Sequence, residues 1–128
     1  MSQPTAPVKM LVVDDELRIC DFLKGFFTTK GYEVSSANSG EEALVQVPTI
    51  RPQIVLLDVR MPGMSGLDTL SKIKALAPDT KVIMVTALDD DALMAEARSR
   101  GAADYITKPF SFDYLEGAVL RKLGHPSA

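Results

Sequence analysis

The chain has 128 residues, enough for one compact domain with a real hydrophobic core. Apolar residues make up 46% and charged residues 24%, which argues against a disordered chain. The formal net charge of −3 lacks the basic excess that general nucleic-acid binding requires, so we expect no direct contact with nucleic acid.

Cysteine content and apolar runs indicate the compartment. The single cysteine, Cys20, cannot form an internal disulfide or a thiolate metal cage. The longest apolar runs, such as residues 54–57, are far too short to cross a bilayer. Residues 1–7 are polar and proline-rich, without the apolar stretch of a signal peptide. We therefore expect a reduced cytoplasmic protein that does not contact membranes.

The first part of the chain predicts strand, helix, strand and helix in turn. Residues 10–13 are a short apolar run typical of a strand buried on both faces of a parallel sheet. Residues 19–27 repeat apolar side chains at spacings of three and four, which indicates an amphipathic helix. A weaker strand candidate covers residues 33–37, and Ser39 with Glu42 has the spacing of a capping box for the next helix.

Pro48 falls inside this second helical pattern. A proline within a helix removes a backbone donor and costs about 3 kcal/mol. We therefore expect the helix to end or kink near Gln46 or Val47, with Pro52 closing the loop before the next strand.

The rest of the chain repeats the alternation three more times. Apolar runs predict strands over residues 54–57 and 82–85, and a weaker candidate covers residues 104–107. Helices follow these strands, indicated by apolar spacing, by acidic residues in a first turn or by a serine cap. They are marked, in order, by residues 67–73, 89–101 and 111–123.

Five strand–helix units with short connections imply an α/β fold, a doubly wound, five-stranded parallel sheet of (βα)5 type. We expect about two helices on one face of the sheet and three on the other. One domain should cover residues 8–123. Residues 1–7 are expected to form a disordered N-terminal segment, and residues 124–128 a tail or truncated linker.

Polar residues follow the predicted strands where an open α/β sheet binds its ligands, outside the carboxyl ends. The first strand leads into Asp14-Asp15, the third into Asp58, the fourth into Thr86 and the fifth into Lys108. Three clustered carboxylates repel one another unless a cation intervenes, and Mg²⁺ binds carboxylates together with phosphate oxygens. A carboxylate beside that ion can act as a nucleophile and form an aspartyl-phosphate. The lysine and the threonine hydroxyl suit contacts to phosphoryl oxygens.

The sequence resembles a known family, the receiver domain of bacterial two-component response regulators. The resemblance runs from about Lys9 to Leu123 and implies the flavodoxin-like strand order 2-1-3-4-5. Its motifs occur in the expected order and spacing. They are residues 12–16, 57–66, 85–87 and 101–110.

The resemblance implies a phosphorylation site and its metal. Asp58 would accept a phosphoryl group from a histidine kinase or a histidine phosphotransfer protein. Asp14 and Asp15 match the acidic pair that holds Mg²⁺, helped by the Asp58 carboxylate and the backbone carbonyl of Arg60. Apart from its own phosphorylation and dephosphorylation, such a domain turns over no external substrate, so we expect no enzyme in the metabolic sense.

The resemblance also implies a conformational switch. Lys108 matches the phosphate-binding lysine, and a cis peptide bond before Pro109 would aim it into the site. Thr86 matches the switch hydroxyl, and Tyr105 the aromatic residue that moves from an exposed to a buried position when Thr86 is drawn inward. The face formed by the fourth helix, fifth strand and fifth helix would bind a downstream protein or effector domain.

Two side chains bear on how long a phosphoryl group would survive. In the family, the residues two positions after the phosphoacceptor and two after the switch hydroxyl stand beside the path of the attacking water. Here these are Arg60 and Leu88, neither of which orients a water as an amide or a carboxylate does. We therefore expect slower self-dephosphorylation than in relatives that carry Asn and Glu at these two positions.

The residues leave other interpretations of the function open. The chain could be the receiver half of a longer DNA-binding transcriptional regulator, or an interaction module that takes no phosphate. Taken alone, an Asp-Asp-Glu run before a helix is a common cap, and Tyr105 could simply fill the core. The chain has neither a G-x-x-x-x-G-K-[ST] nor a G-x-G-x-x-G pattern, which excludes those two nucleotide-binding loops.

Overall fold

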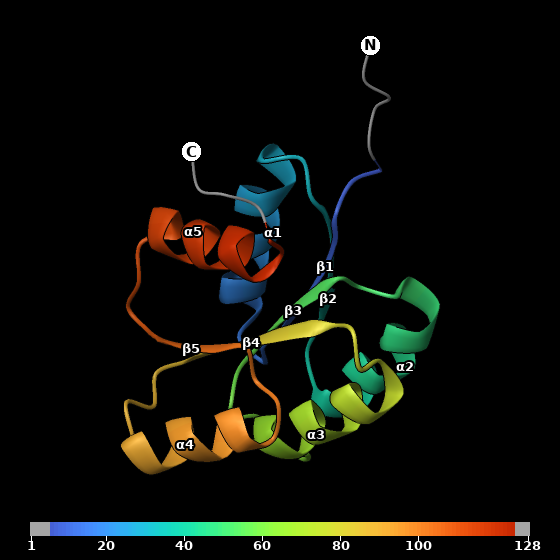
Figure 1. The fold of residues 1–128 in the computed structure, drawn as a ribbon. Helices are drawn as coiled ribbons and strands as arrows, with labels where there is room; N and C mark the ends of the chain where they lie inside the picture. Colours follow the sequence, from blue (N-terminus) through green and yellow to red (C-terminus); the bar gives the residue numbers. More distant parts are fainter. Residues whose placement is uncertain (1–5, 125–128) are drawn as a thin grey trace.

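In the computed structural model, residues 6–124 are described, and they form five strand–helix units in sequence (Figure 1). The predicted N-terminal segment 1–7 and tail 124–128 therefore lie largely outside the described residues. The elements are β1 (Lys9–Val13), α1 (Leu17–Thr29), β2 (Glu33–Ala37), α2 (Gly40–Ile50), β3 (Ile54–Leu57), α3 (Gly66–Leu76), β4 (Lys81–Thr86), α4 (Asp91–Ser99), β5 (Asp104–Thr107) and α5 (Phe112–Lys122).

The five strands form one parallel sheet in the order β2-β1-β3-β4-β5, as predicted. The register aligns the strand ends: Val13 of β1 pairs with Leu57 of β3, and Thr86 of β4 pairs with Thr107 of β5. All four residues of β3 are buried, because helices cover both faces of the sheet. The residues that follow the strands consequently meet at one edge.

Two hydrophobic cores lie on opposite faces of the sheet. Alternate residues of a strand point to opposite faces, so Met10 and Val12 pack with α1 and α5, whereas Leu11 and Val13 pack with α2, α3 and α4. Figure 1 shows these two groups of helices on either side of the sheet. The prediction of two helices on one face and three on the other is confirmed.

The second helix does not end where the sequence indicated. Instead of stopping at Gln46 or Val47, α2 continues through Pro48 to Ile50. Pro48 removes the one N–H that would donate to the Leu44 carbonyl, and only Thr49 and Ile50 follow it in the helix, so the disturbance is confined to the helix end. The chain then turns out of the helix at Arg51, whose φ of 53° is left-handed and whose N–H donates to the Val47 carbonyl.

Four of the five helices begin with a side-chain cap. Ser39, Ser65, Asp90 and Ser111 each accept a hydrogen bond from a backbone N–H in the first turn of α2, α3, α4 and α5. The N-cap of α1 is Glu16, and its side chain makes no such bond. Among residues 6–124, no helix has both the length and the apolar composition to span a bilayer.

Candidate functional site

The predicted site residues meet at the carboxyl edge of the sheet. Asp14 directly follows β1, Asp58 follows β3, Thr86 ends β4 and Lys108 follows β5. They surround or line a cleft of about 570 Å³ that opens at this edge. The cleft is lined by Asp15, Glu16, Asp58, Arg60, Met61, Pro62, Thr86, Ala87, Leu88 and Lys108.

The ammonium group of Lys108 lies between two buried carboxylates. Its Nζ is 2.9 Å from Asp14 Oδ2 and 3.3 Å from Asp58 Oδ2, while Asp14 and Asp58 are only 3% and 6% exposed. The peptide bond between Lys108 and Pro109 is cis, as the family resemblance implied. A residue distant in sequence thus provides the positive charge that two neighbouring buried carboxylates require.

Backbone groups hold the remaining carboxylate oxygens. The N–H of Glu16 donates to Asp14 Oδ1 at 2.9 Å, and the N–H of Arg60 donates to Asp58 Oδ1 at 3.2 Å. Gly66, the first residue of α3, packs so closely on Asp58 that a Cβ there would collide with the Asp58 carbonyl. The orientation of Asp58 is therefore set by the loop that leads from β3 into α3.

Burial and ion pairing act in opposite directions on the pKa values of this group. Burial raises the pKa of Asp14, and its hydrogen bonds from Glu16 and Lys108 only partly offset that effect. For Lys108, burial alone would lower the pKa. The hydrogen bonds and negative charges of Asp14 and Asp58 outweigh this burial effect, so the pKa of Lys108 is raised. The lysine is firmly cationic in the folded protein.

Three carboxylates offer oxygen atoms to one cation. Single oxygens of Asp14, Glu16 and Asp58 lie within 4.8 Å of one another. Hard oxygen donors with net negative charge are what Mg²⁺ binds in proteins, so the donor set fits this ion. The exposed Asp15 lines the same cleft but is not a member of this group of three.

Glu16 is an acidic residue of this group that the sequence interpretation did not single out. It was recognised only as part of the Asp-Asp-Glu motif. The available signal was its spacing: in the extended segment before a helix, residues two positions apart point to the same side, which pairs Glu16 with Asp14 rather than with Asp15.

The backbone of Leu88 connects the two predicted switch residues. Its N–H donates to Thr86 Oγ1 at 3.3 Å, and its carbonyl accepts a 2.6 Å hydrogen bond from the Tyr105 hydroxyl. Tyr105 is 7% exposed, so the structure shows the buried position of the side chain and not the exposed one from which it was predicted to move. The role of the Leu88 backbone carries no sequence signal, because any residue could supply it.

Cys20 is a packing residue on α1. Its side chain is 2% exposed, and its Sγ donates to the backbone carbonyl of Asp14 at 3.3 Å. Burial, followed by the charge of Asp14, raises the pKa of the thiol to about 11. The thiol is therefore protonated and poorly nucleophilic at neutral pH.

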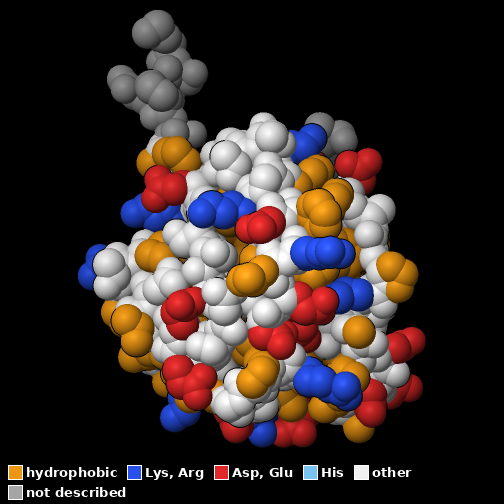
Figure 2. Space-filling model, turned by 180° about the vertical axis from the view of Figure 1, so that it is seen from behind, with side chains coloured by type: hydrophobic (Ala, Val, Ile, Leu, Met, Phe, Trp, Pro, Cys, Tyr) orange, Lys and Arg blue, Asp and Glu red, His pale blue; other side chains and the backbone are white. Residues whose placement is uncertain are grey.

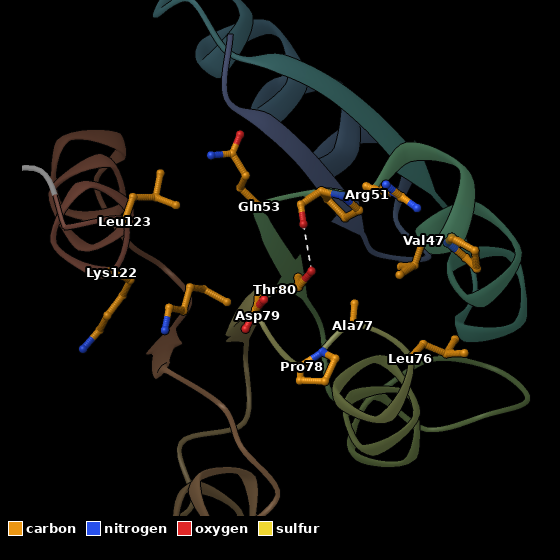
Figure 3. Close-up of a pocket in the computed structure, with 13 residues that line it drawn as sticks. Val47, Arg51, Gln53, Leu76, Ala77, Pro78, Asp79, Thr80, Lys122 and Leu123 are labelled. Carbon is orange, nitrogen blue, oxygen red and sulfur yellow. Dashed lines mark hydrogen bonds between the residues drawn. The ribbon is translucent and has the colours of Figure 1, made fainter. Parts of the chain in front are cut away.

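A larger hollow, of about 640 Å³, lies at the opposite edge of the sheet between the ends of α2, α3 and α5 (Figure 3). The Thr80 hydroxyl donates to the Pro52 carbonyl at 2.8 Å within it. The charged ends of Arg51 and Lys122 point away from each other. None of the residues predicted from the sequence as a site lines this hollow.

The surface charge is mixed. On the face seen in Figure 2, Lys and Arg side chains are interspersed with Asp and Glu side chains and do not merge into one basic patch. This distribution agrees with the modest net negative charge of the chain.

Comparison with known proteins agrees with this geometry. The model of the response regulator receiver domain matches residues 10–120. The transcriptional regulatory protein ZraR of Escherichia coli is 42% identical over 92% of this chain, which spans only 27% of that relative. Sporulation initiation phosphotransferase F of Bacillus subtilis is 36% identical over 90% of this chain and 93% of its own length.

Solved structures give the same result. The response regulator TrrA from Thermotoga maritima, solved in complex with Mg²⁺ and BeF, is 36% identical and superimposes with a TM-score of 0.81. The similarity covers 89% of this chain and 97% of that one. Together with the fold and the family-model match over most of its length, this similarity shows that the chain belongs to the response regulator receiver domain family.

Proposed function

We propose that this receiver domain accepts a phosphoryl group on Asp58 with the help of Mg²⁺. The observation that carries the proposal is the buried Asp58 carboxylate beside the Lys108 ammonium, at the mouth of an open cleft. In the transfer, a carboxylate oxygen of Asp58 bonds to phosphorus while the bond to the donor breaks. A phosphohistidine donor whose other ring nitrogen carries a proton leaves as neutral imidazole, with the electron pair of the broken N–P bond on nitrogen.

Each neighbouring residue has a distinct part in this transfer. Asp14, Asp15, Asp58 and the Arg60 carbonyl would hold Mg²⁺, whose charge would offset the charge on the phosphoryl oxygens. Lys108 already contacts Asp58 and needs only a small shift to meet a phosphoryl oxygen on it. Sporulation initiation phosphotransferase F, which the chain matches over most of that protein's length, is named for phosphoryl transfer and so supports the same chemistry.

Phosphorylation would be read out through Thr86. The Thr86 hydroxyl would donate its hydrogen to a phosphoryl oxygen, and movement of Oγ1 toward that oxygen would lengthen the hydrogen bond that Oγ1 accepts from the Leu88 N–H. Because Leu88 also accepts from Tyr105, the change would reach β5 and the loop before α4. A partner or effector domain that binds the α4–β5–α5 face would detect it, provided that it distinguishes the two arrangements by a few kcal/mol.

The donor would be a histidine kinase or a histidine phosphotransfer protein, and the controlled partner a downstream protein. The chain spans about a quarter of ZraR, so in a protein of that kind the controlled partner would be an effector domain of the same polypeptide.

Intact-mass measurement after treatment with phosphoramidate and Mg²⁺ tests the proposal. We expect the wild-type chain to gain one phosphoryl group and Asp58→Asn to gain none. Asp79→Asn, an exposed substitution at the opposite edge of the sheet, is the matched control and should label like wild type. Labelling of Asp58→Asn at the wild-type rate would refute Asp58 as the acceptor.

A further inference from the structure

We infer that Glu41 is a positioning residue for the phosphoacceptor, because it holds the loop between β3 and α3 from outside the site. The inference rests on the proposed function, since it concerns the same Asp58. Glu41 lies in the first turn of α2, and its Oε2 accepts a hydrogen bond of 3.3 Å from the backbone N–H of Met64. Met64 belongs to the loop of residues 58–65, which begins at Asp58.

The loop has few hydrogen bonds of its own. Within residues 6–124, the part of the loop that follows Asp58 donates two backbone hydrogen bonds. The Arg60 N–H donates to Asp58 Oδ1 at 3.2 Å and so holds the phosphoacceptor carboxylate itself. The Met64 N–H donates to Glu41 and so ties the far end of the loop to another element. A reacting carboxylate depends on such support, because a misplaced nucleophile reacts more slowly.

Glu41 contacts the exposed half of the loop. Val59 and Met61 are buried in the core, and their packing fixes the first half of the loop. Pro62 and Gly63 are exposed, although Pro62 also lines the cleft beside the phosphoacceptor. Core packing therefore does not hold this second half, which lies against the Glu41 carboxylate instead.

Two glycines allow α2 to lie this close to the loop. Gly63 has a φ of 79°, and a Cβ there would lie only 3.0 Å from Glu41 Oε2. Gly40 directly precedes Glu41, and a Cβ on it would collide with the hydroxyl of the buried Thr69 in α3. The helices α2 and α3 consequently lie side by side (Figure 1), which gives Glu41 a fixed place beside the loop.

The charge of Glu41 would also stabilise its own helix, because a carboxylate in a first turn interacts favourably with the helix dipole. That effect requires the charge, whereas the hydrogen bond to Met64 requires only an acceptor oxygen. Glutamine keeps an acceptor oxygen without the charge, and alanine keeps neither. Glu41→Gln and Glu41→Ala therefore distinguish the two roles. Asp113→Ala is the matched control, since Asp113 is exposed and stands two residues after the serine N-cap of α5, as Glu41 does in α2.

The rate of labelling by phosphoramidate and Mg²⁺, followed by intact mass, measures the effect on the phosphoacceptor. We expect Glu41→Ala to label about fivefold more slowly than wild type, which corresponds to about 1 kcal/mol, the net contribution of one hydrogen bond. Glu41→Gln and Asp113→Ala should both label within about twofold of the wild-type rate.

Hydrogen exchange of the Met64 amide, measured by NMR without Mg²⁺ or phosphodonor, reports the contact itself. The exchange should be about fivefold faster in Glu41→Ala and within about twofold of wild type in Glu41→Gln.

Three results would overturn the inference. One is a Glu41→Ala protein that labels at the wild-type rate. Another is equally slow labelling of Glu41→Gln and Glu41→Ala, because the charge would then be the cause. The third is slow labelling of Glu41→Ala with unchanged exchange at Met64, since Glu41 would then act elsewhere. A wild-type chain that gains no phosphoryl group would refute the proposed function itself, and the inference with it.

Discussion

Replacement of Lys108 by methionine is expected to destabilise the protein strongly and to make its stability depend on Mg²⁺. The lysine side chain is 14% exposed and is the cation that both Asp14 and Asp58 contact. Its removal leaves two buried negative charges without their partner. Removing one partner of a buried ion pair costs about 3–5 kcal/mol of stability. Because Asp14 and Asp58 each keep a hydrogen bond from a backbone N–H, we expect a loss at the lower end of that range, about 3 kcal/mol.

Mg²⁺ should restore much of this loss, because a divalent ion supplies the missing positive charge without competing with an ammonium group. At a concentration of 100 times its Kd, an ion that binds only the folded state adds about 2.7 kcal/mol. The ion should stabilise Lys108→Met more than wild type, in which Lys108 already neutralises part of the group.

Urea unfolding at neutral pH, with and without Mg²⁺, measures both effects. Lys24→Met removes a lysine from an exposed position of α1 and should change the free energy of unfolding by less than about 0.5 kcal/mol. In a double-mutant cycle, Asp14→Asn should recover part of the loss in Lys108→Met, because one unpaired charge is gone. A Lys108→Met protein as stable as wild type without Mg²⁺ would show that Asp14 and Asp58 do not depend on the ammonium group.

Three further predictions use other residues of the site and core. The double substitution Arg60→Asn with Leu88→Glu should speed hydrolysis of the phosphoryl group by about tenfold or more, which corresponds to roughly 1.4 kcal/mol of activation barrier. The assay is the decay of phosphorylated protein after the donor is removed. An unchanged half-life would exclude water access at these positions as the limiting factor. Asp15→Ala should abolish metal-dependent phosphorylation, measured by intact mass. Because the substitution relieves repulsion among carboxylates, the free energy of unfolding should stay equal or rise. A variant that keeps full Mg²⁺ dependence would show that Asp15 has no role in binding the metal. Burial, and to a lesser extent nearby acidic charges, raises the pKa of Tyr32 and Tyr105 above the ordinary 10.0. The tyrosines of the unfolded chain therefore lose their protons first, and the free energy of unfolding should fall as pH rises past that value. A phenolate absorbance titration should show that Tyr32→Phe and Tyr105→Phe each remove one late-titrating group; if neither does, burial does not control these tyrosines.

Three of the five strands, β1, β3 and β4, were predictable from their short apolar runs, whereas β2 and β5 were weaker candidates. Residues 54–57 are four consecutive apolar residues, a length and composition that suit a central strand covered on both faces, and all four are buried in β3. The alternation of strands and helices then restricts the topology to a parallel sheet. The end of α2 was not predictable, because a proline near the end of a helix can either stop the helix or be followed by a short last turn, and only the left-handed conformation of Arg51 in the structure shows where the chain leaves the helix.

The chemical groups that follow the strands can be read from the order of residues alone: three aspartates, a threonine and a lysine, all at strand ends. Their convergence was inferable, since parallel strands align their carboxyl ends. Which acidic side chains face Lys108 became clear from the folded structure. Carboxylate oxygens of Asp14 and Glu16 lie 2.9 Å and 3.6 Å from its ammonium group, whereas Asp15 forms no ion pair with it in the described part of the chain. The direction of a side chain before a helix depends on backbone angles that residue types do not specify. The same holds for Tyr105, whose burial depends on a hydrogen bond to the Leu88 carbonyl, a group that every residue has.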